Sequence, residues 1–208
     1  MSRKTIGFSV MTAAGLLLAE PALAHHVMDG RMPVTFADGL LSGLGHPVIG
    51  LDHFAAVVAI GCLAGAHRAG SALSIGFVLA MMAGAAAHLA GTNVPGADVW
   101  VALSVIALGV VMLMRYEMRA GTALALFAAT GLVHGYALGG SIYGAEQTPL
   151  AAYFIGLALI QSTIALIAMN VARMLMRRAA GIPSLRMVGA GIAGVGLAML
   201  SQQVILGV

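Results

Sequence analysis

Charged residues are scarce in this chain of 208 amino acids. Lys and Arg number ten and Asp and Glu seven, together 8% of the sequence, while 61% of the residues are hydrophobic. Soluble domains carry about 25% charged residues. The shortage excludes an ordinary soluble enzyme, a nucleic-acid-binding protein and a disordered tail. The shortage of charge predicts a membrane protein, most of whose surface faces the lipid bilayer.

Cysteine and several catalytic motifs are also missing. The single cysteine, Cys62, excludes an intrachain disulfide and a metal site built from cysteines alone. No G-x-x-x-x-G-K-[ST] sequence is present, so the chain itself carries no ATP-driven motor. Neither H-E-x-x-H nor G-x-S-x-G occurs. The chain is therefore not predicted to be an enzyme.

Apolar runs of membrane-spanning length fill most of the chain. A span needs about 20 apolar residues, and six such runs predict an all-α, polytopic membrane helix bundle that forms one domain over residues 25–208. A shorter amphipathic piece, 34–45, precedes them, and Pro47 is expected to break or kink the chain where this piece meets the first span. The predicted spans are 48–66, 71–90, 97–114, 121–140, 148–172 and 185–206.

The first 24 residues have the pattern of a secretory signal peptide. Arg3 and Lys4 precede an apolar run over residues 6–19, and Ala22-Leu23-Ala24 fits the small-x-small cleavage pattern. Cleavage after Ala24 would leave a mature chain that begins at His25. The alternative is an uncleaved first transmembrane helix.

Basic residues in the predicted loops all fall on one side of the membrane. Because cytoplasmic loops are enriched in Lys and Arg, that side is predicted to be cytoplasmic. The mature N-terminus is then periplasmic, and the protein lies in the bacterial inner membrane. The basic residues are Arg68, Arg115, Arg119, Arg173, Arg177, Arg178 and Arg186.

Ionisable residues inside the spans point to a binding site, because such residues are costly in lipid unless they are paired or hydrated. His46, Asp52 and His53 lie within eight positions. Seven residues make almost two helical turns, so a continuous helix would place both imidazoles on one face. Two imidazoles and a carboxylate suit Ni²⁺, Co²⁺ or Zn²⁺. The alternative is a structural pairing of Asp52 with His53.

Five further residues are candidate ligands toward the same outer side. His88, His134 and Glu146 would line an entry route for a cation, and His25 and His26 would meet the ion beside the new amine. Each has a simpler alternative: an interfacial histidine in water for His88, a helix–helix hydrogen bond for His134, and a disordered tail for the N-terminal pair.

Two motifs resemble those of the HupE/UreJ family. Residues 46–53, H-P-V-I-G-L-D-H, are similar to its H-P-x-x-G-x-D-H signature, and residues 133–137, V-H-G-Y-A, are similar to its F-H-G-x-A block. The resemblance implies a secondary transporter (permease) for nickel or cobalt. It also implies that five residues handle the ion: His46, Asp52, His53, His134 and Glu146.

The working hypothesis is import of Ni²⁺ or Co²⁺ with no cofactor other than the transported ion. Two alternatives stay open at this point. One is an intramembrane metal-dependent hydrolase, and the other is a haem-binding membrane subunit with His88 and His134 as axial ligands. The sequence predicts no oligomeric state.

Overall fold

The computed structural model describes residues 32–114, 118–178 and 181–206. The predicted signal peptide, 1–24, and the candidate ligands His25 and His26 lie outside these residues, so both remain predictions.

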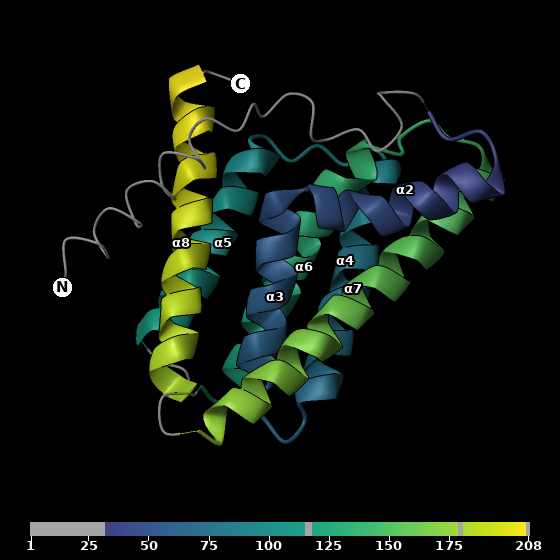
Figure 1. Cartoon of the computed structure of the whole chain (residues 1–208). Coiled ribbons are helices and arrows are strands. Elements are labelled where there is room, and N and C mark those ends of the chain that lie inside the picture. The colour runs from purple at the N-terminus through teal and green to yellow at the C-terminus, as the bar shows by residue number, and fades with distance from the viewer. Residues whose placement is uncertain (1–31, 115–117, 179–180, 207–208) are drawn as a thin grey trace.

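Helices make up all the regular secondary structure of the described residues (Figure 1). Five described helices are long and apolar enough to cross a membrane, and the bent pair of α2 and α3 makes a sixth if the two are counted as one broken span. The prediction of an all-α polytopic membrane bundle is confirmed. The helices are α2 (Phe36–Ile49), α3 (Leu51–Ala64), α4 (Gly70–Leu89), α5 (Ala97–Met114), α6 (Ala120–Gly140), α7 (Gln147–Met176) and α8 (Gly181–Leu206).

The first predicted span, 48–66, is not one continuous helix in the structure. α2 continues through Pro47 to Ile49, the chain bends by 78°, and α3 begins at Leu51. The break therefore falls at Gly50, three residues after the proline. A Cβ at Gly50 would lie 3.0 Å from Cδ2 of His53 and 3.2 Å from the Asp52 carboxylate, so crowding at the bend favours a glycine there.

The last two helices are longer than predicted. α7 has 30 residues and ends at Met176, whereas the prediction stopped at 172 before the first arginine. A helix of this length measures about 45 Å, more than the roughly 30 Å of hydrocarbon. Figure 1 shows α7 tilted across the bundle, and tilt is one way in which a membrane accommodates a helix of this length.

α3 lies at the centre of the bundle and packs against every other described helix. Its apolar residues from Ala55 to Ala64 are at most 6% exposed, except Val58, which is partly buried. Alanine, valine and glycine dominate this stretch, and small side chains let neighbouring backbones approach closely. At the start of α3, Asp52 and His53 are buried, whereas Leu51 and Phe54 are exposed.

α4 and α6 form the most extensive helix pair. Gly131, Gly135 and Gly139 repeat every four residues along α6, and a Cβ on them would meet Phe77, Met81 and Ala85 of α4 in turn. This is the small-xxx-small pattern of close helix contacts in membranes. The contact fixes the position of His134, which lies within the glycine repeat.

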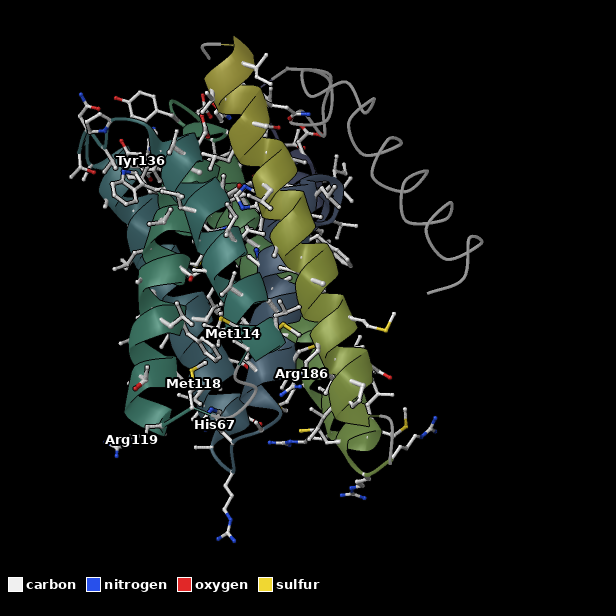
Figure 2. All side chains as sticks on the ribbon, turned by 90° about the vertical axis from the view of Figure 1, so that its left-hand side faces the viewer. His67, Met114, Met118, Arg119, Tyr136 and Arg186 are labelled. Atoms are coloured by element: carbon white, nitrogen blue, oxygen red, sulfur yellow. The ribbon has the colours of Figure 1, made fainter. Side chains whose placement is uncertain are left out.

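Charges are separated along the bundle axis. We call the end with α2 and residues 90–96 and 141–146 the acidic end, and the end with residues 65–69 and 177–178 the basic end. Figure 2 shows Arg119, Arg186 and His67 at the basic end and Tyr136 at the opposite end. The described carboxylates at the acidic end are Asp38, Asp52, Asp98 and Glu146.

Arg173 links two helix ends at the basic end. Its Nε donates to the carbonyl of Gly65 at 3.4 Å, and its Nη2 donates to the carbonyl of His67 at 3.1 Å. A cation is favourable at these carbonyls, which follow the C-terminus of α3.

Gly135→Ala tests the close contact of α4 and α6. The new Cβ would lie on the carbonyl of Met81, so the helices must separate, at a cost of about 1–3 kcal/mol. We expect a lower melting temperature in detergent. Gly121→Ala on the same helix is the control, because a Cβ there meets nothing within 4 Å. Equal melting temperatures for the two variants would contradict the contact.

Candidate metal site

The bend at Gly50 brings three of the predicted ligands into one buried cluster. His46 lies in the last turn of α2, and Asp52 and His53 lie in the first turn of α3. Their exposed fractions are 6%, 5% and 4%. The rings of His46 and His53 have centroids 6.0 Å apart with planes at 53°. Proximity thus comes from a bend, and not from the continuous helical face expected from the seven-residue spacing.

Asp52 stabilises the N-terminus of α3. Its Oδ1 accepts a hydrogen bond of 2.8 Å from the backbone N–H of His53. The first turn of a helix has unpaired N–H groups and favours a negative charge. The structural role considered for Asp52 is therefore present, although its bond goes to the backbone of His53. The same contact holds a carboxylate inside the membrane protein beside two imidazoles.

His134 of α6 joins the cluster from the opposite side of α3. Its Nδ1 lies 2.8 Å from Nδ1 of His53, and the ring centroids are 5.0 Å apart. Only 1% of His134 is exposed. The helix–helix hydrogen bond considered for His134 therefore exists, and its partner is another predicted ligand.

Ser104 of α5 determines which nitrogens carry protons. Its hydroxyl donates to the carbonyl of Val101 at 2.7 Å, so at 2.8 Å it accepts from Nε2–H of His134. The Nδ1 of neutral His134 is then an acceptor, and Nδ1–H of His53 donates to it. His134 is neutral in this arrangement, the form in which histidine binds metals.

Sequence reasoning missed Ser104. Its signal was present, because it is the one side chain with a hydrogen-bonding group between Trp100 and Met114. A serine bonded to its own helix is common in membrane spans, so the sequence did not distinguish it.

The cluster gathers ligands without forming a coordination shell. Among the described residues, no three His, Cys, Asp or Glu side chains are arranged to hold a metal ion. Nδ1 of His53 carries a proton and donates it to Nδ1 of His134, so the lone pair of His134 points to that proton and is not directed at a shared metal position. A metal ion would need to replace this hydrogen bond.

His88 lies apart from the cluster. Its ring packs on Tyr136 at 4.5 Å and Tyr143 at 5.8 Å between centroids, and its Nδ1 is buried without a hydrogen-bond partner. Tyr136 and His134 are two residues apart on α6, about 200° around the helix. His88 and His134 therefore lie on different sides of α6.

Glu146 is exposed at the N-cap of α7. It lies at the acidic end of the bundle, outside the buried cluster. The structure thus brings His46, Asp52, His53 and His134 together and places His88 and Glu146 elsewhere.

These features define a class of protein: a polytopic membrane bundle with a buried histidine and aspartate cluster at a broken span. A family model described as HupE / UreJ protein matches residues 12–199. The chain is 32% identical over 135 residues to Protein HupE of Rhizobium leguminosarum bv. viciae, covering 64% of this chain and 68% of that protein. No solved structure matches. The chain belongs to the HupE/UreJ family.

Ser104→Ala tests the proton assignment in the cluster. Removal of the hydroxyl leaves the buried Nε2–H of His134 without its acceptor, at a cost of about 1–3 kcal/mol. We expect reduced stability in detergent and a changed ¹⁵N chemical shift for His134. Ser201→Ala is the control, because Ser201 donates to the Ala198 carbonyl as Ser104 does to Val101. Unchanged His134 shifts in Ser104→Ala would refute the assignment.

Proposed function

We propose that this protein is a secondary transporter that imports Ni²⁺ or Co²⁺ through the cluster of His46, Asp52, His53 and His134. Membership of the HupE/UreJ family, a transporter-type family, supports a role in the transport of these metals. The observation that carries the proposal is the convergence of three imidazoles and a carboxylate inside the bundle. Imidazole nitrogen suits Ni²⁺ and Co²⁺ better than it suits Mg²⁺ or Ca²⁺.

Charge separation along the bundle supports the direction of transport. The exposed carboxylates Asp98 and Glu146 would raise the local concentration of cations at the acidic end. The basic end carries the arginines, which favour the cytoplasmic side. The acidic end would then face the periplasm, together with the mature N-terminus, and the protein would lie in the inner membrane.

On binding, the metal ion would replace the hydrogen bond between His53 and His134 as the link between these two side chains. His134 already presents a lone pair on Nδ1, and a small ring displacement would free it from His53. To bind the ion at the same place, His53 would move its proton from Nδ1 to Nε2, so that Nδ1 also presents a lone pair. A neutral hydrogen bond contributes only about 1 kcal/mol, so little is lost when it breaks. The buried carboxylate of Asp52 would compensate part of the ion's charge. Such an adjustable set of ligands suits transport, since a complete rigid shell would retain the ion.

The geometry does not favour the alternatives. Two axial haem ligands must approach one iron from opposite faces of a porphyrin, whereas His88 and His134 have α6 between them. A hydrolytic zinc site needs three protein ligands and an open position for water, whereas Nδ1 of His53 and Nδ1 of His134 bond to each other. Transport requires ligands that rearrange.

Asp52→Asn tests the proposal with little disturbance of the fold. The amide oxygen of asparagine can still accept from the His53 N–H, so the N-terminus of α3 keeps its cap while the charge is lost. We expect uptake of radiolabelled Ni²⁺ and Co²⁺ to fall about tenfold or more at equal protein abundance, in a host without its own importers.

The matched control is Asp38→Asn. Asp38 accepts from the Thr35 N–H at 3.0 Å in the capping box of α2, so it is also a carboxylate bonded to a backbone N–H in the first turn of a helix, but it lies twelve residues before the bend at Gly50. Its variant should retain uptake. Equal uptake by both variants would remove Asp52 from the transport mechanism, and no uptake by the wild-type protein would refute import of these metals.

A further inference from the structure

Three buried oxygens in the bundle core have no hydrogen-bond partner. They are Oγ of Ser74, Oγ1 of Thr130 and Oε1 of Gln161, on residues that are 3%, 2% and 1% exposed. Buried polar groups in proteins almost always have partners, because an unsatisfied one destabilises the fold. In a membrane bundle no bulk water is at hand to satisfy them. These oxygens therefore need an explanation.

Four other hydroxyls of the described residues are satisfied by a carbonyl of the preceding turn. Ser104, Ser141, Thr163 and Ser201 each donate to the carbonyl three or four residues earlier, at 2.7–2.8 Å. Ser74 and Thr130 could make the same local bond and do not. The difference distinguishes these two buried hydroxyls from those four.

Thr130 lies one helical turn from the cluster, on the side of the basic end. It precedes His134 by four residues on α6, so the two side chains share a helix face about 6 Å apart along the axis. Since α6 runs from the basic to the acidic end, Thr130 is the next polar group of α6 on the way from the cluster to the basic end.

Gln161 reaches the same level from α7. It belongs to a buried stripe with Leu157 and Ala165. A Cβ on Gly61 of α3 would meet Ala165, so α3 and α7 run side by side in parallel. One turn nearer the acidic end, Gln161 lies beside the segment of α3 around Val57. That segment is one turn from His53 toward the basic end.

Ser74 continues the series on α4. A Cβ on Gly131 would lie 2.6 Å from the carbonyl oxygen of Phe77, which aligns this part of α4 with Thr130 and its neighbours. Ser74 precedes Phe77 by three residues and shares its buried face. α4 starts at the basic end, so Ser74 is nearer to that end than Thr130.

We propose that the oxygens of Thr130, Gln161 and Ser74 form a second station for the cation, between the histidine cluster and the basic end. This inference rests on the proposed transport function and extends it. The station offers hydroxyl and amide oxygens and no charge, so it would hold a partly hydrated divalent cation. Ni²⁺ and Co²⁺ bind such oxygens less tightly than imidazole, and weak successive sites allow an ion to leave.

Replacement of the oxygens by apolar groups of similar shape separates this role from a structural one. In Thr130→Val and Gln161→Met, we expect the affinity of the purified protein for Co²⁺ to stay within about twofold of wild type, because the histidine cluster is intact. Uptake of Co²⁺ into proteoliposomes should fall about tenfold or more. The melting temperature should be unchanged or higher, because an unpaired buried oxygen has been removed.

Two further variants serve as controls. Thr163→Val removes a hydroxyl from the exposed side of α7, where it donates to Leu159, and should leave uptake unchanged. Thr130→Ser keeps the hydroxyl, so uptake by this variant should be close to that of the wild type, in contrast to Thr130→Val.

Several results would overturn the second station. One is wild-type uptake by both Thr130→Val and Gln161→Met. Another is loss of both Co²⁺ binding and uptake in Thr130→Val and Gln161→Met, because the oxygens would then be part of the first site. Loss of both is the result that we expect for His53→Ala. Failure of Thr130→Ser to restore uptake would show that the hydroxyl is not needed. Absence of uptake by the wild-type protein would refute the transport function itself, together with the station.

Discussion

The bend at Gly50 is the constraint on which the candidate site depends. It ends one helix and starts another inside a membrane bundle, and the new N-terminus of α3 needs an acceptor for its N–H groups. Asp52 supplies that acceptor. The same bend turns His46 toward His53, whose ring then reaches His134 of α6. A helix that continued straight through Gly50 would present neither the carboxylate nor the histidine pair in this way.

Close packing keeps the cluster in place. The glycine repeat of α6 sets the distance of that helix from α4, and the small residues of α3 allow five spans to surround it. Hydrophobic burial cannot drive helix association in lipid as it does in water, so van der Waals contacts and interhelical hydrogen bonds stabilise the association instead. The bond between His53 and His134 is one of these contacts. It serves the fold while its atoms remain suited to a metal ion.

Much of the fold could be predicted, because long apolar runs and scarce charge determine spans directly. The histidines and Asp52 could also be predicted, since ionisable residues in lipid are rare. A break before the first span could be predicted, but not its position at Gly50, because proline is the stronger helix breaker and Pro47 lies in a helix here. Nor could Ser104, Thr130 and Gln161, whose significance depends on which neighbour each one has or lacks. Helix boundaries were wrong where arginines follow a span, since α7 continues past Arg173.

The central claim is that a divalent cation takes the place of the hydrogen bond between His53 and His134. X-ray absorption spectroscopy of the purified protein loaded with one equivalent of Ni²⁺ tests it most directly. The account predicts a first coordination shell that contains at least two imidazole nitrogens, and the loss of imidazole scattering in His53→Ala. A shell made only of oxygen atoms, or an identical spectrum for wild type and His53→Ala, would contradict it.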